Sequence, residues 1–557
     1  GTGAACDDTD DFRWIEATID AAHAAIESGE LTCEEIVVGH LARIAEHDLD
    51  ISDGAPINAF VMLNEDVRED ARRLDRRYAA HGELVGALHC VPIVIKSNYD
   101  STDTTTTNGT FALEGTQARR DAYALEQMRD QGAILIGATG MDEFADGVHG
   151  ISGRHGRTGN PYDTTKNPGG SSAGSGAAVA ASFAVGATGT DSCGSLSIPA
   201  GYNGLVTMRS TIGLVSTRGV FPGGLLDTVA GPMARSVGDM AYMLDAMATF
   251  DQLALRHRIG SWRRPKSFVD HLDPDGLEGR RIGILRKLAG ETGDIYREPF
   301  TGGNADTHGT WTRAFDDLER LGAQTVENVR LPRFVERRYS GGKIVATNRH
   351  LRRTDGPVSS YAEMCRTNNF SKHSFDDVQA CLTKSRTGLL NPIEGIPDGL
   401  NTYDANADHM ETVMDRLRLD ALVLPVDSYG AARPRAVKPN CIETAVSGLP
   451  AIVVPAGVSA GDIEMPVGLM FIARRFDEAT LIEIAYAFEK GTGWRRPPTL
   501  APVDSGTSSA EMNLAEQNAL RREIAWTAFD DVLRDGDKFA LDAERFREIV
   551  REVMEGG

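Results

Sequence analysis

Two short apolar runs rich in β-branched residues, 91–95 and 133–137, enclose a segment of helical character at 119–131. Runs of this length between turn signals are typical of buried strands. Similar runs return at 421–425 and 451–455. A strand–helix–strand alternation of this kind restricts the chain to a layered architecture, so we expect an α/β fold.

Helical patterns occupy both ends of the chain. Thr32 and Glu35 form a capping box that predicts a helix start, and Gly29 predicts the end of the helix before it. Residues 505–557 are polar and charged with one apolar stripe at helical spacing, which predicts a helical C-terminal tail. That stripe needs a partner, either the tail's own domain or a second copy of the chain in a homodimer. We expect removal of the tail to leave the chemistry intact.

Charge and hydropathy argue against a nucleic-acid partner and a membrane span. The 557 residues include 58 Lys and Arg and 80 Asp and Glu, which gives a net charge of −22. Affinity for nucleic acid comes largely from basic residues that neutralise phosphates, so we expect no nucleic-acid partner. No run of eighteen or more strongly apolar residues occurs, so we expect no membrane span.

The N-terminus and the cysteines bear on the compartment. Small residues ending at Cys6, followed by acidic residues, look like the remnant of a bacterial lipoprotein signal, and a trimmed terminus is the alternative. We expect residues 1–11 to be a disordered or processed tether and the protein to be cytoplasmic or exported.

None of the seven cysteines forms a CxxC pair, so we expect no metal and no cofactor. The six cysteines after Cys6 could pair, but scattered cysteines are more often free and buried.

Two stretches rich in glycine and serine, 167–176 and 189–199, are the strongest chemical signal. Glycine-rich backbone beside a serine allows unusual dihedral angles and leaves N–H groups free to point at an oxyanion. Tight turns alone could require such glycines. Two stretches close together, after a strand that ends in Lys96, favour a catalytic site instead.

Several alternatives for these stretches are weaker. Residues 170–174 fit the G-x-S-x-G motif, but that motif needs a strand directly before it, and 160–168 contains two prolines. Cys193 has no His–Asn pair placed with it by sequence. We expect Asp191 to be a hydrogen-bonded turn residue, and His149 and His155 to have polar loop roles.

Taken in order, the motifs resemble the amidase signature family of serine hydrolases. The resemblance covers about residues 12–500 and is carried by 91–96, 169–175, 189–199, 447–457, 465–469 and 476–480. It implies a single large α/β/α domain, residues 12–504, around a mixed, mostly parallel β-sheet, with N-terminal helices and the C-terminal tail 505–557. One domain therefore replaces the three or four that length alone suggests.

The resemblance also implies a Ser–cis-Ser–Lys triad. Ser195 would be the nucleophile, Ser171 the bridging serine after a cis peptide bond, and Lys96 the base. The oxyanion would be bound by the backbone N–H groups of Ser192, Cys193, Gly194 and Ser195, with Gly170, Ser172 and Asp191 supporting the site. Burial beside an apolar strand lowers the pKa of a lysine, and a value of about 7 to 8 would suit a base at neutral pH. Because the oxyanion donors are main-chain groups, we expect replacement of Cys193 by Ala to cost little.

Departures from the family pattern leave the substrate open. Cys193 stands where glycine is usual, Ser197 where arginine is common, and Met208–Ser210 where Leu-Lys-Pro is usual. The segment 215–235 is nearest to peptide-amidase-like members. The resemblance thus implies an amidohydrolase that cleaves a carboxamide C–N bond of a small molecule or peptide and releases ammonia or an amine.

Two other functions compete with this one. The alternative within the family is the glutaminase component, called the A subunit, of a glutamyl-tRNA amidotransferase complex, which needs partner subunits. The second is a catalytically dead binding protein, and the intact Lys96, Ser171 and Ser195 argue against it.

Overall fold

The structure is a computed structural model. It describes residues 12–556 apart from 53, 222–227, 255–261, 286–304, 328, 332–333, 335–342, 373, 391–395, 428–439, 461–462, 501–512 and 535. Cys6 and the predicted tether at residues 1–11 lie outside the described residues.

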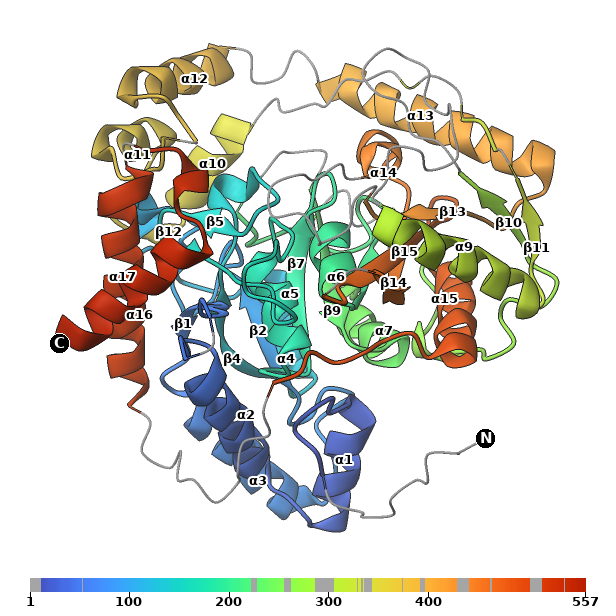
Figure 1. Ribbon diagram of the computed structural model, residues 1–557, viewed down its shortest axis with the longest axis horizontal. Helices are drawn as coiled ribbons and strands as arrows, with labels where there is room; N and C mark the ends of the chain where they lie inside the picture. The colour runs from blue at the N-terminus through green and yellow to red at the C-terminus, as the bar shows by residue number, and fades with distance from the viewer. Residues whose placement is uncertain are drawn as a thin grey trace.

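Eleven of the described strands form one sheet through the centre of the molecule (Figure 1), in the order β1-β4-β2-β7-β9-β8-β14-β15-β13-β10-β11. β2, β4, β13 and β14 coincide with the apolar runs, and their side chains are buried or nearly so along their whole length because both faces of the sheet are covered. The strands are β1 (Phe60–Leu63), β2 (Pro92–Lys96), β4 (Ile134–Thr139), β7 (Gly186–Asp191), β8 (Val206–Arg209), β9 (Val229–Ala234), β10 (Arg281–Ile284), β11 (Gln324–Val326), β13 (Ala421–Pro425), β14 (Ala451–Val458) and β15 (Pro466–Ile472). Two-stranded sheets pair β3 (Gln117–Ala118) with β12 (Thr354–Asp355), and β5 (Ile151–Ser152) with β6 (Gly156–Arg157).

The sheet is mixed, as predicted, but the expectation that it is mostly parallel is wrong. Among the described strands, four pairings are parallel and six are antiparallel. β9 lies antiparallel between β7 and β8, and a short connection joins β14 to its antiparallel neighbour β15. Connections as short as this one cannot cross over the sheet, so they make antiparallel neighbours.

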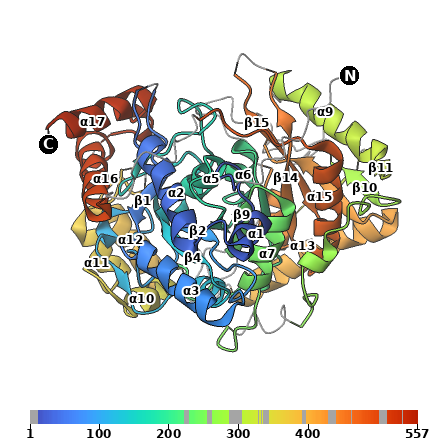
Figure 2. The same cartoon turned by 90° about the horizontal axis from the view of Figure 1, so that it is seen from below.

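Helices surround the sheet (Figure 2). Gly29 ends α1 in the left-handed conformation, and the capping box of Thr32 and Glu35 starts α2, both as predicted. No helix among the described residues combines the length and apolarity needed to cross a bilayer. The helices are α1 (Ile19–Ser28), α2 (Cys33–His47), α3 (Val67–His81), α4 (Tyr123–Asp130), α5 (Ala173–Ala180), α6 (Ser197–Tyr202), α7 (Val237–Met247), α9 (Ala305–Arg320), α10 (Lys343–Leu351), α11 (Tyr361–Thr367), α12 (Val378–Leu390), α13 (Ile396–Leu417), α14 (Ile442–Ser447), α15 (Glu478–Thr492), α16 (Leu514–Ala528) and α17 (Ala543–Gly556).

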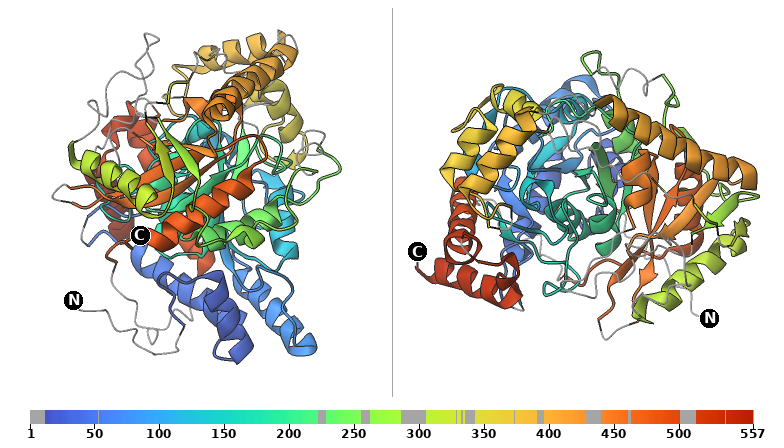
Figure 3. Two further views of the ribbon diagram at one scale, coloured as in Figure 1. Left: turned by 90° about the vertical axis from the view of Figure 1, so that its right-hand side faces the viewer. Right: turned by 90° about the horizontal axis from the view of Figure 1, so that it is seen from above.

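The C-terminal helices α16 and α17 pack on their own chain, beside the edge strand β1 and near α11 (Figure 3). Asn518 binds the main chain of Leu63 on that edge, accepting from its N–H at 2.7 Å and donating to its carbonyl at 3.0 Å. Phe529 and Phe546 are buried in a cluster with Phe111. The tail therefore packs on its own domain, which is one of its two predicted partners. The homodimer stays a prediction.

All six described cysteines are paired, which settles the two possibilities that the sequence left open in favour of pairing over free, buried thiols. The disulfides are Cys33–Cys90, Cys193–Cys441 and Cys365–Cys381, with sequence separations of 57, 248 and 16 residues. Separation along the chain says nothing about distance in a folded sheet, which is why the sequence could not indicate these pairs. Disulfides of this number are typical of oxidising compartments.

Candidate active site

Lys96 ends β2 and is fully buried. Its Nζ lies 2.7 Å from Ser171 Oγ and 2.9 Å from Thr190 Oγ1, near the end of the neighbouring strand β7. Burial lowers the pKa of Lys96 to about 7, although the carboxylates of Asp142 and Asp191 act to raise it. A large fraction of this lysine is therefore an uncharged amine at neutral pH.

Ser171 is buried and follows a cis peptide bond from Gly170, as the sequence resemblance implies. Gly170 has no room for a side chain, because a Cβ there would lie 2.0 Å from Asp142 Oδ2. The N–H of Asp142 also donates to the carbonyl of Ser171, at 3.2 Å. Asp142 thus packs directly against the peptide that presents the Ser171 hydroxyl to Lys96.

Ser195 lies in the loop between β7 and α6 and is 7% exposed. Its carbonyl accepts from the N–H of Ser172 at 3.3 Å, so the two Gly/Ser-rich stretches are in direct contact. Gly194, just before it, has a φ of +87°, a left-handed conformation that favours glycine. The fold therefore brings the residues of both stretches to the ends of β2 and β7.

Asp191 organises this loop. Its carboxylate accepts from the N–H of Gly194 at 2.9 Å and of Leu196 at 2.8 Å, which confirms the predicted hydrogen-bonded turn. Of the four predicted oxyanion donors, the N–H of Gly194 is therefore already engaged. The N–H groups of Ser192 and Ser195 have no acceptor within the described part of the chain. These two remain able to bind an oxyanion.

Arg209 is the partner of Asp191 that sequence reasoning missed. Its Nε lies 3.3 Å from Asp191 Oδ1, and both side chains are fully buried. Arg209 also donates to the carbonyl of Leu449 at 3.3 Å, which links the loop to β14's end of the sheet. The sequence does mark this position. Residues Met208–Ser210 depart from the usual Leu-Lys-Pro of the family, and Arg209 stands where the lysine is usual.

The supporting residues have structural roles. Ser172 Oγ lies 3.4 Å from both the N and the O of Thr190, so it links the two stretches a second time. His155 is buried with its ring against Thr158 at 2.8 Å, and burial lowers its pKa to about 3, so it stays neutral. The His149 ring contacts Asn167 at 3.2 Å. Both histidines thus have the polar loop roles that we expect.

The C-terminal tail reaches the edge of this site, which sequence reasoning did not anticipate. The Phe539 ring packs edge-on against His149, 5.1 Å between ring centres. Its neighbour Lys538 is buried, and burial lowers the pKa of that lysine while Asp142 and Asp146 raise it. The charge of Asp142 thus acts both on Lys96 and on a lysine of the tail. That removal of the tail leaves the chemistry intact stays a prediction.

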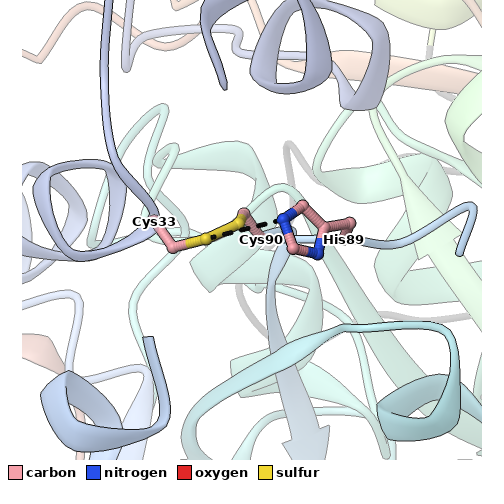
Figure 4. Close-up of side chains that lie close together, drawn as sticks. All are labelled: Cys33, His89 and Cys90. Atoms are coloured by element: carbon pink, nitrogen blue, oxygen red, sulfur yellow. Dashed lines mark hydrogen bonds between the residues drawn. A yellow bond between two sulfur atoms is a disulfide. The ribbon is translucent and has the colours of Figure 1, made fainter. Parts of the chain in front are cut away.

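One group of metal-ligating side chains occurs among the described residues, and it lies away from this site. Cys33, His89 and Cys90 meet where α2 approaches the start of β2 (Figure 4), with His89 Nε2 3.9 Å from Cys33 Sγ. Metal binding requires cysteine thiolates. Because the two sulfur atoms are joined in a disulfide, neither is a thiolate in this state.

Comparison with known proteins shows the family and the overall fold. The family model described as Amidase matches residues 51–482. The A subunit of the glutamyl-tRNA(Gln) amidotransferase of Symbiobacterium thermophilum is 32% identical over 486 residues, which are 84% of this chain and 94% of that protein. The structure of the native peptide amidase of Stenotrophomonas maltophilia superposes with a TM-score of 0.77 at 32% identity, over 88% of this chain and 100% of that one. An amidase family protein of Bacillus anthracis str. Ames gives a TM-score of 0.74 at 26% identity, over 87% and 93% of the two chains.

Proposed function

The chain belongs to the amidase signature family of amide-hydrolysing enzymes, and we propose that it cleaves a carboxamide through an acyl-enzyme on Ser195 with Ser171 and Lys96 as its proton relay. The observation that carries this proposal is the 2.7 Å contact between Lys96 Nζ and Ser171 Oγ. A buried lysine with a pKa of about 7 is uncharged in a large fraction of the molecules at neutral pH, and this uncharged amine can accept a proton from a serine hydroxyl. A solvated lysine at the end of a strand would stay protonated.

The attack begins with a proton transfer. Ser171 passes its proton to Lys96 and takes the proton of Ser195, whose Oγ then adds to the amide carbonyl carbon. The carbonyl oxygen becomes an oxyanion. We assign its binding to the backbone N–H groups of Ser192 and Ser195; Cys193 lies between these two residues in the sequence. Gly194, whose N–H donates to Asp191, holds the loop in place rather than binding the oxyanion.

The same relay then works in reverse. The tetrahedral intermediate collapses when its C–N bond breaks, and Ser171 gives a proton to the departing nitrogen while Lys96 resupplies it. Protonation is essential because an amide anion is a very poor leaving group. Water, activated by the relay, hydrolyses the ester on Ser195 and regenerates the enzyme.

Peptide amides are the substrate class that we propose first. The support is the structural match over the full length of a peptide amidase, together with the peptide-amidase-like segment at 215–235. Residues 12–504 would be the catalytic domain, with the tail of residues 505–557 outside it.

A release assay tests the proposal. Purified protein is incubated with peptide amides, acyl amides, anilides and glutamine, and ammonia or amine is measured for wild type and for Ser195→Ala. We expect release from at least one class by wild type, strongest with peptide amides, and a loss of about 10⁴-fold or more in the variant. Release that is equal in the two proteins would refute the role of Ser195.

The second candidate is the glutaminase component of an amidotransferase complex. It is supported by the relatives of 32% and 30% identity that carry that name. The acidic charge and the docked tail are less favourable to it. Glutaminase activity that appears only after partner proteins are added, with no activity on peptide amides, would favour this function instead.

A further inference from the structure

A covalent bond crosses the molecule at the loop that carries Ser195. Cys193, two residues before Ser195, is bonded to Cys441, 248 residues further along the chain, with 5.0 Å between the two Cα atoms. The loop follows β7 in the N-terminal half of the chain, whereas Cys441 is the residue that precedes α14. The disulfide therefore joins the loop to a segment from the C-terminal half.

The Cys441 end of this bond is held firmly. The neighbouring Asn440 donates from its N–H to the carbonyl of Val426 at 2.9 Å and from Nδ2 to the carbonyl of Pro425 at 2.7 Å, at the end of β13. Asn406 of α13 donates to the carbonyl of Val446 in α14 at 3.0 Å. Cys441 itself is buried. Cys441 is thus held between the end of β13, through Asn440, and the start of α14.

The loop end is close-packed against Cys441. A Cβ added to Gly194 would lie 3.4 Å from the Cβ of Cys441 and 2.7 Å from Cδ1 of Ile198. The loop is also held by hydrogen bonds to the Asp191 carboxylate and by the hydrogen bond from the N–H of Ser172 to the carbonyl of Ser195. Asp191 and Ser172 are both in the N-terminal half of the chain, so the disulfide is the covalent restraint that comes from the C-terminal half.

We propose that the Cys193–Cys441 disulfide positions the N–H groups of the loop and the Ser195 hydroxyl, so that Cys441 is a positioning residue and turnover depends on the redox state of this pair. The proposal rests on the proposed function of the loop. Oxyanion donors work only when they lie at hydrogen-bonding distance from the developing charge, and a misplacement of about 1 Å can cost about 10²-fold in rate. Opening the bond would release the loop on the side of Cys441.

The chemistry is an ordinary thiol–disulfide exchange. Cys193 is only partly buried and Cys441 is buried, so we place the attack of a dithiol at the sulfur of Cys193. One thiolate of the dithiol attacks the disulfide to form a mixed disulfide, and its second thiol displaces the remaining protein thiolate. Two electrons pass from the dithiol, which becomes a disulfide, to the protein, which gains two thiols.

A pair of double variants tests this inference. Cys193→Ser/Cys441→Ser removes the bond, and Cys365→Ser/Cys381→Ser, which removes the disulfide between α11 and α12, is the matched control. For each we measure kcat and KM on the amide substrate, the rate constant of inactivation by a fluorophosphonate, and the response of both to dithiothreitol. Circular dichroism and thermal unfolding report whether each variant folds.

For the 193/441 variant we expect kcat and the inactivation rate to fall about 10- to 100-fold with KM changed less than about twofold, and no response to dithiothreitol. Wild type and the control variant should lose activity to the same degree when reduced and regain it on reoxidation. A merely structural bond would lower the melting temperature and leave kcat of the folded fraction unchanged.

Two results would overturn the inference. One is a folded 193/441 variant with wild-type kcat, and the other is wild type whose kcat is unaffected once mass mapping shows Cys193 and Cys441 reduced. Reduction of folded wild type supplies the answer if the double variant does not fold. Failure of the proposed function is recognised separately, because hydrolysis by wild type would then survive Ser195→Ala.

Discussion

Lys96 is fully buried at the end of β2, and burial lowers the pKa of its ammonium group to about 7. Only the uncharged amine can take a proton from Ser171, so the fraction of active enzyme follows the deprotonation of this one side chain. The apolar run before Lys96 made its burial predictable. The contacts of its Nζ with Ser171 and Thr190 depend on the alignment of β2 with β7, which no local pattern specifies.

The pH dependence of the reaction follows from this lysine. Below pH 7 Lys96 gains a proton and cannot act as a base, so we expect kcat/KM to fall with a slope of one as the pH drops through about 7 and to level off above it. The rate of inactivation by a fluorophosphonate should fall in the same way as the pH drops through about 7. A profile that stays flat from pH 5 to 9 would show that no group of this pKa controls the attack.

Removal of the lysine should affect amides and esters differently. We expect Lys96→Ala to lower kcat/KM on an amide by about 10²–10⁴-fold, because general acid–base catalysis is lost in both attack and departure of the amine. A matched ester has a better leaving group and should lose at least about tenfold less. Steady-state kinetics on an amide–ester pair with the same acyl group measures the difference, and equal losses would contradict the relay.

Single residues also show where sequence reasoning stopped. Motifs pointed to Lys96, Ser171 and Ser195, because glycine-rich stretches and a strand-end lysine are visible in a sequence. Asp142 and Arg209 were missed, since each acts through a contact that only the folded sheet creates. The expected tolerance of Cys193→Ala treated that side chain as unattached, whereas it is bonded to Cys441.

Among the elements, the tail helix α16 is held to its own domain by contacts that the sequence pattern does not show. Arg521 on α16 forms an ion pair with Asp48, and both side chains are buried. Asp48 also accepts from the N–H of Ala59 at 2.6 Å, just before β1. The helix is thus joined to the sheet edge by a buried charge pair as well as by apolar packing.

We expect Arg521→Ala to lower the free energy of unfolding by about 3–5 kcal/mol, because it leaves the Asp48 carboxylate buried without its partner. Arg522→Ala, at the next and largely exposed position, is the matched control and should change stability by less than about 1 kcal/mol. Chemical denaturation of the full chain measures both. Equal effects would show that the pair does not hold the tail.

Prediction succeeded for elements with strong local signals and failed for their partners. The capping box of α2, the Gly29 stop and the apolar strands were readable because each signal lies within a few residues. The direction of the strands could not be predicted in this way. β9 lies between β7 and β8 because of pairing between distant segments, which no local pattern encodes. The mostly parallel sheet was therefore wrong, although the α/β class was right.

At the scale of the whole molecule, one large sheet joins segments from both halves of the chain. Lys96 ends β2, the loop with Ser195 follows β7, and β13 and β14 lie further along the same sheet. The disulfide between Cys193 and Cys441 connects the loop after β7 to the C-terminal half of the chain. The net charge of −22 discouraged a nucleic-acid partner but held no information on the reaction. The chemistry depends on a few polar groups at the ends of adjacent strands.

The most direct test of the central claim is to find the covalent bond to Ser195. Wild type and Ser195→Ala are treated with a fluorophosphonate, and intact mass followed by peptide mapping locates the adduct. We predict one adduct per chain in wild type, on Ser195, formed faster as the pH rises through about 7, and none in the variant. An adduct on another residue, or the same labelling in Ser195→Ala, would contradict the account.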